Sequence, residues 1–319
     1  MAKIFIDGSA GTTGLRIHER LKDRADLEVI VLTGESRKDP DARKAAIEEA
    51  DIAFLCLPDA AAIEAVELAK DSDTVIIDTS TAHRTAGGWT YGMPELHKGA
   101  QRGKIAASKR IANPGCHASG FIALAAPLTE GGLIRSDAAL SCFSLTGYSG
   151  GGKKMIAEYE DADRDVLFDA PRLYGLTQQH KHLPEMQKLS GLQTAPVFCP
   201  IVSDFYSGME VAVPLFPKDL AGGAGIDEIR SYLKDYYGDA AGAPGKQGLI
   251  RYLDAADDGG LISAGKYSGR DDMAVTVTGN EERILLVSLF DNLGKGASGA
   301  AIQNMNIVLG VPEETGLTL

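Results

Sequence analysis

The chain opens with an apolar segment, residues 3–7, that runs directly into three evenly spaced glycines, Gly8, Gly11 and Gly14. A helical pattern follows from residue 15 to about residue 21. Glycines between a strand and a helix let the backbone approach a pyrophosphate, which the unpaired N–H groups of the helix N-terminus bind. The spacing departs from G-x-G-x-x-G. Its context nevertheless predicts a dinucleotide-binding βαβ unit rather than a glycine-rich surface turn.

The same alternation of strand and helix continues through the first quarter of the chain. Apolar patterns predict strands at 28–32, 52–57 and 74–77. Helices are expected at 41–50 and at 59–70, the second capped by Asp59. Strands that alternate with helices indicate a parallel, doubly wound α/β sheet of the Rossmann type.

The regular alternation of strands and helices ends after residue 116. Strands are expected at 138–145, 196–202, 209–215, 273–277 and 284–290, with one clear helix among them at 227–237. Segments 221–225 and 238–248 are expected to be loops, and residues 298–309 a final helix. This pattern predicts an α+β domain with a largely antiparallel sheet.

The end of the second strand bears on the choice of cofactor. Ser36, Arg37 and Lys38 can hold a 2′-phosphate and favour NADP, whereas Glu35 leaves NAD open. With the glycine-rich turn, the expected cofactor contacts are Gly8, Ser9, Gly11, Thr12, Thr13, Gly14, Ser36 and Arg37.

Cys116 follows a Pro-Gly turn and precedes an apolar run, residues 121–127, that predicts a helix. A helix N-terminus favours a thiolate, and its N–H groups can hold an oxyanion. The sequence therefore makes Cys116 a candidate nucleophile, the alternative being a buried core cysteine beside a turn. The other cysteines, Cys56, Cys142 and Cys199, lie in apolar strands and are expected to be structural.

Two of the six histidines, His180 and His182, lie close to Glu185. Histidine exchanges protons near neutral pH, and a cysteine nucleophile needs such a partner nearby in space. The alternatives are a metal pair or a solvated basic loop. No nearby cysteine or third histidine completes a zinc site, so we favour acid/base catalysis and expect no metal.

Other polar segments are candidates for binding ligands. Residues 144–154 are interpreted as a flexible cationic loop in which Lys153 can hold an anionic substrate. Arg84 and Arg110 are candidates for phosphate or carboxylate by charge alone, and Asn113 is added as a substrate contact. Segment 291–299 has small residues that let backbone approach a ligand, and its Asn292 is assigned to the cofactor.

Composition narrows the classes of partner. With 32 basic and 44 acidic residues the net charge is -12, which argues against a nucleic-acid or anionic-membrane binder. No apolar run approaches the ~20 residues of a membrane span, and the start of the chain does not resemble a signal peptide. Widely separated cysteines without a C-x-x-C pair fit a reducing cytoplasm.

These motifs, in this order, resemble the shorter, type 2 form of N-acetyl-γ-glutamyl-phosphate reductase, in the aspartate-semialdehyde and glyceraldehyde-3-phosphate dehydrogenase-like superfamily. The resemblance spans nearly the whole chain. It rests on the following segments: 8–14, 91–96, 113–116, the glycine-rich loop 144–154 with Lys153, 180–185, 291–297 and 303–306. The chain departs at His117, where the family usually has an aromatic residue. Its segment 79–84 only loosely matches the family's Ser-Ala-Asp-Phe-Arg.

The resemblance implies a Rossmann domain at 1–115, rejoined by the C-terminal helix at about 293–319, and a glyceraldehyde-3-phosphate-dehydrogenase-like catalytic and oligomerisation domain at 116–292. It implies NADPH-dependent reduction of an acyl phosphate. Cys116 forms a thioester, hydride reduces it, and His180 or His182 protonates the oxyanion. A homodimer or homotetramer in the cytoplasm is expected.

Two other readings remain open. The same chemistry serves an aspartate-semialdehyde dehydrogenase or an N-acetyl-aminoadipyl-phosphate reductase, and the pocket size that separates them is not encoded in any motif. A non-enzymatic NADP sensor is also conceivable. The combination of Cys116 with the histidine segment argues against it, because a sensor needs no nucleophile.

Overall fold

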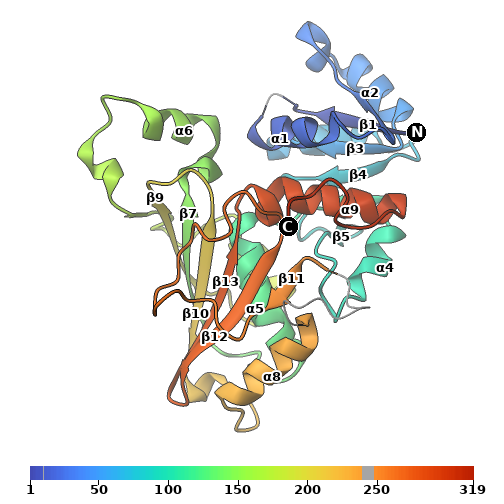
Figure 1. The fold of residues 1–319 in the computed structure, drawn as a ribbon. Helices are drawn as coiled ribbons and strands as arrows, with labels where there is room; N and C mark the ends of the chain where they lie inside the picture. The colour runs from blue at the N-terminus through green and yellow to red at the C-terminus, as the bar shows by residue number, and fades with distance from the viewer. Residues whose placement is uncertain (10, 239–247) are drawn as a thin grey trace. The chain divides into compact units, whose positions relative to one another are not determined.

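The computed structural model describes residues 1–9, 11–238 and 248–319, without the side chain of Thr12. These residues form two compact units, each described here by itself (Figure 1). Unit 1 comprises Met1–Pro94, Arg102–Gly115 and Ala297–Thr318. Unit 2 comprises Glu95–Gln101, Cys116–Gly296 and Leu319.

Unit 1 is built on a six-stranded sheet of order β2-β1-β3-β4-β6-β5, in which every described pair is parallel. Its strands are β1 (Ala2–Asp7), β2 (Leu27–Ile30), β3 (Ile52–Leu55), β4 (Val75–Asp78), β5 (Thr90–Tyr91) and β6 (Arg110–Ala112). The order reverses between β1 and β3, and ligands of such sheets bind at the carboxyl ends of the strands beside the reversal. The structure therefore confirms the predicted doubly wound sheet and places Gly8, directly after β1, at that point.

Helices cover both faces of this sheet because alternate strand residues point to opposite sides. Ile4 and Ile6 pack with α1 and α9, while Phe5 packs with α2 and α3. The helices are α1 (Thr12–Leu21), α2 (Pro40–Glu49), α3 (Asp59–Leu68), α4 (Gln101–Ala106) and α9 (Gly299–Leu309), with a 3-10 turn η1 (Gly34–Arg37). The last helix of the chain thus completes the core of unit 1.

One local expectation in this unit was wrong. Pro58, not Asp59, is the N-cap of α3, and Asp59 is its first helical residue. The Asp59 carboxylate instead accepts hydrogen bonds from the backbone N–H and the hydroxyl of Thr81, at 2.9 and 2.5 Å. It therefore holds the segment after β4.

Unit 2 is built on a seven-stranded sheet of order β11-β12-β13-β10-β7-β9-β8. Its strands are β7 (Ser141–Gly147), β8 (Arg172–Leu173), β9 (Val197–Ser203), β10 (Met209–Leu215), β11 (Ile250–Tyr252), β12 (Met273–Asn280) and β13 (Arg283–Phe290). Only β7–β9 and β11–β12 are parallel among the described pairs, so the sheet is largely antiparallel, as predicted.

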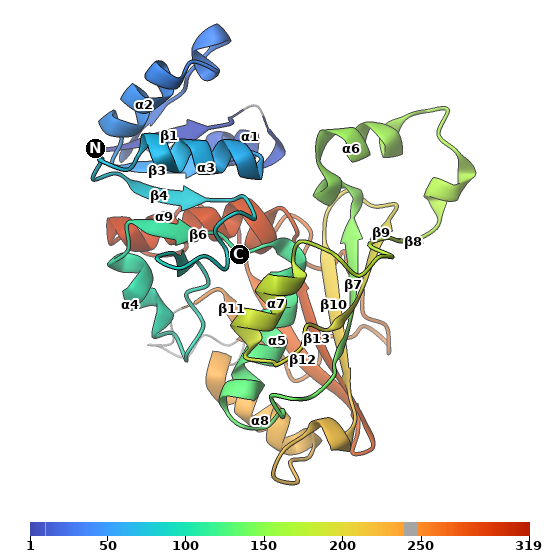
Figure 2. The ribbon, with the colours of Figure 1, turned by 180° about the vertical axis from the view of Figure 1, so that it is seen from behind.

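Helices α5 (Cys116–Glu130), α7 (Leu183–Ser190) and α8 (Ile226–Tyr237) lie on one face of the unit 2 sheet (Figure 2). A further helix, α6 (Gly152–Glu160), follows β7. Short 3-10 turns are η2 (Tyr148–Gly151), η3 (Val166–Asp169) and η4 (Pro217–Asp219), and a π-helical turn, η5 (Gly294–Ser298), precedes α9. Among the described residues, no helix is long and apolar enough to cross a membrane.

The expected loop at 144–154 was wrong. The helix expected at 227–237 is present as α8, but α6 and α7 also lie between the strands of this unit. Residues 144–147 continue β7, because they pair with β9 and β10, and Ser144 is fully buried. Lys153 lies in α6 and α7 follows the histidines. Tertiary pairing overrides the polar and glycine-rich composition that suggests a loop. The expected loop at 238–248 falls mostly on 239–247, outside the described residues.

We predict that Gly14→Ala destabilises the protein. A Cβ at Gly14 lies 2.4 Å from the Gly8 carbonyl oxygen, so α1 has to move away from the turn. Overpacking of this kind costs about 1–3 kcal/mol of unfolding free energy, measured by urea denaturation. Gly103→Ala is the matched control: the new Cβ on α4 meets nothing within 4 Å, and we expect an unchanged or slightly higher stability. Equal losses in both variants contradict the prediction.

Candidate active site

Cys116 is the first residue of α5, a 15-residue helix whose body is buried in unit 2. Cys116 is partly exposed, as a nucleophile requires; Cys56 and Cys199 are partly exposed too, and Cys142 is buried. Burial raises the pKa of Cys56 to about 12 and also raises the pKa of Cys142. Their protonated thiols fit the structural role that the sequence predicts for them.

The glycine segment before α9 closes on Cys116 rather than leaving open space for a ligand. A Cβ at Gly296 lies 3.0 Å from the Cys116 Cβ and 3.0 Å from the Asp291 carbonyl oxygen. The segment is a π-helical turn, a form found frequently at functional sites. Glycine at 296 therefore lets this turn pack directly beside the candidate nucleophile.

A buried ion pair holds the same turn within unit 2. The Lys295 ammonium lies 2.7 Å from the Glu95 carboxylate, and both side chains are less than 5% exposed. Glu95 also accepts a hydrogen bond from the Leu249 backbone N–H, at 2.9 Å. Removal of one partner of such a pair leaves a buried charge without its counter-ion, so the pair fixes the turn strongly.

The two predicted histidines lie together in irregular backbone just before α7. Their ring centroids are 4.8 Å apart. The segment is fixed to β9 by Gln178, whose side-chain amide donates to the Phe198 carbonyl and accepts from its N–H, at 2.7 and 2.9 Å. Among the described residues, no group of three or more His, Cys, Asp and Glu side chains is placed to hold a metal ion.

His180 and His182 differ in accessibility. His182 is buried, while His180 is half-buried and accepts the His182 backbone N–H at its Nδ1, 3.3 Å away. Burial and the nearby Lys181 charge lower the pKa of His180. A neutral ring that accepts at Nδ1 carries its hydrogen on Nε2. Glu185 is 1% exposed, on the first turn of α7.

A third histidine, His117, joins this cluster. Its ring centroid lies 5.9 Å from that of His180 and 5.5 Å from that of His182. Its Nδ1 is 2.6 Å from the Ser144 hydroxyl and its Nε2 is 2.7 Å from the Tyr174 hydroxyl. Burial lowers the pKa of His117 to about 3, so the ring is neutral at physiological pH.

In unit 1 the glycine-rich turn forms a cradle that fits a pyrophosphate. Gly8 has φ +83°, and a Cβ there lies 2.3 Å from the Cys56 carbonyl oxygen, so only glycine is tolerated. The first turn of α1 has no acidic residue and its N-cap, Gly11, offers no side chain. Its N–H groups and positive dipole end suit an anion. The expected contact Thr12 has its side chain outside the described residues, while Ser9 and Thr13 lie in this turn.

The segment after β2 carries the residues expected to hold a 2′-phosphate. Ser36 and Arg37 lie in the turn η1, with Arg37 exposed. The Ser36 hydroxyl donates to the Thr33 carbonyl at 2.6 Å, which stabilises the turn.

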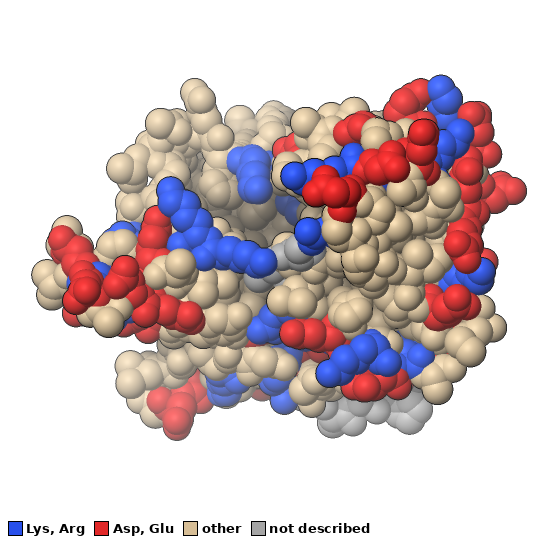
Figure 3. Space-filling model, turned by 90° about the horizontal axis from the view of Figure 1, so that it is seen from above, with Lys and Arg blue, Asp and Glu red and all other residues tan. Residues whose placement is uncertain are grey.

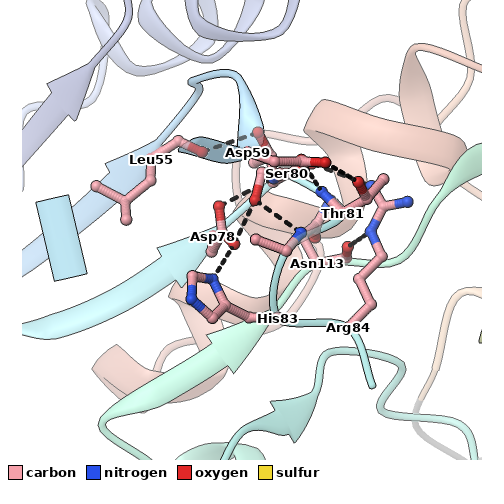
Figure 4. Close-up of polar contacts among 10 residues, drawn as sticks. Leu55, Asp59, Asp78, Ser80, Thr81, His83, Arg84 and Asn113 are labelled. Carbon is pink, nitrogen blue, oxygen red and sulfur yellow. Dashed lines mark hydrogen bonds and ion pairs between the residues drawn. The ribbon is translucent and has the colours of Figure 1, made fainter. Parts of the chain in front are cut away.

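A network at the carboxyl end of β4 was not expected from the sequence (Figure 4). The buried Asp78 carboxylate accepts hydrogen bonds from the Ser80 backbone N–H and hydroxyl and lies 2.6 Å from His83 Nδ1. The His83 ring stacks on Trp89 with centroids 4.1 Å apart. The network fixes segment 79–84 at the edge of the sheet where ligands bind.

The predicted substrate arginines both bind backbone carbonyls of unit 1. Arg84 donates to the carbonyls of Asn113 and Thr79, at 2.9 and 3.0 Å (Figure 4). Arg110 begins β6 and donates to the carbonyls of Thr74 and Ala69, both at 3.1 Å. Arg110 therefore lies at the amino end of the sheet, opposite the ligand-binding edge, and its guanidinium fixes the backbone of residues 69 and 74.

The two predicted asparagines are also engaged with protein groups. Asn113 is 1% exposed and donates to the Ala297 carbonyl at 3.0 Å, so it ties the end of β6 to the π-helical turn η5 before α9. Asn292 accepts from the Gly208 N–H at 2.9 Å and donates to the Ser149 hydroxyl at 3.0 Å. Lys153 is exposed near the start of α6.

Comparisons with known proteins agree with this architecture. Residues 3–103 match the family described as semialdehyde dehydrogenase, NAD binding domain, and residues 116–292 match semialdehyde dehydrogenase, dimerisation domain. The chain is 45% identical to N-acetyl-gamma-glutamyl-phosphate reductase 2 of Nostoc sp., covering 99% of each chain. It is 46% identical to the N-acetyl-gamma-glutamyl-phosphate reductase of Brucella ovis, over 97% of this chain and 99% of that one.

Solved structures of the same fold include two aspartate semialdehyde dehydrogenases. The enzyme II of Vibrio cholerae superposes with a TM-score of 0.71 at 15% identity, over 97% of this chain and 98% of that one. The Candida albicans enzyme, solved with NADP, has a TM-score of 0.69 at 17% identity, over 98% and 99%. At this identity the likeness concerns the fold alone.

We predict that His117 makes the protein acid-sensitive. Its folded-state pKa of about 3 lies below the ordinary value of about 6.5. The contribution of the neutral ring to the unfolding free energy is therefore complete above about pH 6.5 and is lost as the pH falls towards 3. In that window the unfolding free energy changes by up to about 1.4 kcal/mol per pH unit for this one proton.

His117→Gln removes the proton, so its unfolding free energy should depend less steeply on pH between about 4.5 and 6.5. Urea denaturation at several pH values measures the slope. His97→Gln, which replaces a half-exposed histidine, serves as the control and should retain the steep dependence. An unchanged slope in His117→Gln contradicts the assignment.

Proposed function

Because the chain belongs to the N-acetyl-γ-glutamyl-phosphate reductase family of the semialdehyde dehydrogenases, we propose that it reduces N-acetyl-γ-glutamyl phosphate to the semialdehyde and phosphate with NADPH, a step of arginine biosynthesis. The observation that carries the proposal is a partly accessible cysteine at the N-terminus of α5, in the same unit as a cluster of three histidines. Nucleophile and base are the two groups that acyl transfer needs.

Cys116 is the proposed nucleophile. Its thiolate attacks the acyl-phosphate carbon, a C–S bond forms, and the C–O bond to phosphate breaks, leaving a thioester. The N–H groups of the first turn of α5 stabilise the oxyanion as it develops. Since α5 is buried along its length, it holds the sulfur and these donors in a fixed relation.

His180 is the proposed acid/base, because it is more accessible to a substrate than His182. It accepts the proton of the Cys116 thiol and delivers it to the leaving phosphate. After taking one proton from solvent, it protonates the oxyanion of the reduced intermediate and takes that proton back when the thiohemiacetal collapses. Its lowered pKa keeps the ring neutral and ready to accept a proton. His182 and Glu185, at the start of α7, are proposed to orient it. Collapse of the thiohemiacetal returns the thiolate.

NADPH supplies the hydride that reduces the thioester. The glycine-rich turn with Ser9 and Thr13 is proposed to hold its pyrophosphate, and Ser36 with Arg37 its 2′-phosphate. Lys153, exposed near the start of α6, is proposed to hold an anionic group of the substrate. The carbonyl contacts of Arg84 and Arg110, and the protein contacts of Asn113 and Asn292, favour positioning roles for these four residues.

We further propose a homo-oligomer of this chain. The support is a set of exposed apolar side chains on neighbouring strands of the unit 2 sheet, namely Phe143 on β7, Val197 on β9 and Leu173 on β8, 44–58% exposed.

Unit 1 is proposed as the cofactor domain. No nucleic-acid partner is proposed, in keeping with the net charge of -12 and the interspersed acidic and basic side chains on the face in Figure 3. The need for a reduced Cys116 supports a cytoplasmic location.

We predict that Cys116→Ser abolishes turnover while leaving NADP binding nearly unchanged. Without the thiolate no thioester forms, so activity should fall at least about a thousandfold. Purified protein is mixed with N-acetyl-glutamate semialdehyde, phosphate and NADP, and NADPH absorbance is followed. Cys199→Ser, which removes a thiol in β9, is the matched control and should keep its activity.

The outcomes separate the competing functions. Phosphate-dependent NADPH formation that is lost in Cys116→Ser supports the proposal, and retained turnover in that variant rejects the covalent route. Turnover of aspartate semialdehyde alone assigns the chain to the sister activity, and turnover of the one-carbon-longer semialdehyde assigns the aminoadipyl reaction. If no semialdehyde gives NADPH formation and the folded protein still binds NADP, the chain is a sensor.

We predict that Arg37→Ala selectively weakens NADPH binding. A charged hydrogen bond to phosphate contributes about 1.5–3 kcal/mol, so the Kd for NADPH should rise about 10–100-fold. NADH lacks the 2′-phosphate, and its Kd should stay the same. Cofactor fluorescence titration measures both. Lys22→Ala, at the opposite end of α1 from the glycine turn, is the charge-matched control. An equal effect on both cofactors contradicts the role of Arg37.

A further inference from the structure

A buried ion pair links the two segments of unit 1 that the proposed function assigns to the cofactor. Arg43, on α2, has its Nε and Nη2 3.0 and 2.9 Å from one carboxylate oxygen of Asp7, the last residue of β1. The two side chains are only 7% and 5% exposed. The glycine-rich turn begins at the next residue, Gly8, and the Asp7 carbonyl accepts the Cys56 N–H at 2.8 Å. The carboxylate therefore belongs to a fixed part of the sheet, at the edge where ligands bind.

The turn η1 depends on α2 for its position. None of its four residues is buried, and the first buried residue after it is Arg43. The chain between them is short and hydrogen-bonded: the Asp39 N–H donates to the Ser36 carbonyl at 3.3 Å, and the Arg43 N–H donates to the Asp39 carbonyl at 3.0 Å. The Asp39 carboxylate also caps α2 through the Asp41 N–H, at 3.1 Å. A displacement of the first turn of α2 is therefore passed on to Ser36 and Arg37.

The apolar contacts of α2 lie farther along the helix. Ala46 and Ile47 pack in the cluster around Phe5, whereas residues 40–42 are not buried. Glu64, on α3, lies 3.6 Å from the Arg43 Nη1, but its side chain is more than half exposed, so this contact adds little. The Asp7 carboxylate is thus the buried group that holds the amino end of α2 to β1.

We propose that Arg43 is a positioning residue for cofactor specificity: by holding α2 to Asp7, it fixes the position of η1, with its proposed 2′-phosphate contacts, relative to the glycine-rich turn. Arg43 acts through η1 and does not touch the cofactor, because its guanidinium is buried against Asp7. NADH lacks the 2′-phosphate, so the ion pair acts on the preference for NADPH over NADH. The inference rests on the proposed cofactor contacts of Ser36 and Arg37.

The test measures the Kd of NADPH and of NADH by cofactor fluorescence titration, without substrate. Arg43→Met and Asp7→Asn break the ion pair from its two sides. Each should lower the preference, defined as the ratio of the NADH Kd to the NADPH Kd, about tenfold. A change in the glycine-rich turn affects both cofactors alike and cancels in this ratio. Arg43→Lys keeps the charge but not the fork of donors, and should retain part of the preference.

The two single variants separate a positioning role from a simple effect of charge. Loss of the Arg43 charge weakens the attraction for a 2′-phosphate, but loss of the Asp7 charge strengthens it. A positioning role lowers the preference in both variants, whereas a charge effect raises it in Asp7→Asn. The double variant Arg37→Ala/Arg43→Met should lose little more of the preference than Arg37→Ala, since Arg43 acts through η1.

Arg24→Met is the matched control. Arg24 is another buried arginine of unit 1, with its side chain 9% exposed, and it pairs with Asp26, the residue before β2, at 2.6 Å. Its loss should lower the stability without changing the preference, because the pair lies at the amino end of the strands. Urea denaturation of each variant shows that the protein is folded during the titration. If Arg43→Met does not fold, Arg43→Lys and Asp7→Asn carry the test.

An unchanged preference in Arg43→Met and Asp7→Asn overturns the proposal, as does a raised preference in Asp7→Asn. Additive losses in the double variant also overturn it, because they place Arg43 on the phosphate itself. If Arg37→Ala leaves the preference unchanged, the proposed 2′-phosphate contact and this inference are both wrong. If the preference falls as expected in a protein that reduces no semialdehyde, this inference is upheld and the proposed reaction is rejected.

Discussion

The close packing of α5 against the sheet of unit 2 underlies the rest of the site. A Cβ at Gly120 lies 2.5 Å from a Val211 methyl and 2.8 Å from the Phe290 ring, so only glycine lets the helix approach β10 and β13 this closely. Because protein interiors tolerate little change in volume, this contact fixes the axis of α5. The position of Cys116, at the first turn of that helix, follows from it. The π-helical turn then packs beside a residue that cannot move far.

The parts of the fold that were predicted from sequence are those with local signals. The strand before Gly8 and the glycines that follow it are adjacent in the chain, so periodicity and turn chemistry suffice to identify them. The errors arose where distant segments decide. Thr146 and Gly147 look like loop residues among glycines and hydroxyls, but they become strand residues because β9 pairs with both and β10 pairs with Thr146. Helix α7 is too short to show a period.

The candidate site shows the same division. Cys116 and His180 were found because their chemistry is rare and their neighbours are distinctive. Tyr174 and Ser144 carry no motif, and only the fold brings their hydroxyls to the two nitrogens of His117. Charge alone was a weak basis for assigning Arg110 to the substrate. Its guanidinium binds the Ala69 carbonyl, 41 residues away in the chain, and the sequence carries no signal for that contact. The one sequence signal for Tyr174 was its position six residues before His180, the first histidine of the pair.

The return of α9 to unit 1 affects how the protein is made. The sheet of unit 1 is complete by β6, but Ile302 and Met305 of α9 form part of the cluster that covers Ile4 and Ile77. During synthesis the part of that face that α9 covers stays exposed until α9 leaves the ribosome, whereas the strands and helices of unit 2 are already available. Domains generally fold in order of synthesis, and exposed apolar surface promotes aggregation. Unit 1 starts to be synthesised first, but its apolar core is completed last. A chaperone is therefore most needed to cover the apolar surface of the amino-terminal part of the chain.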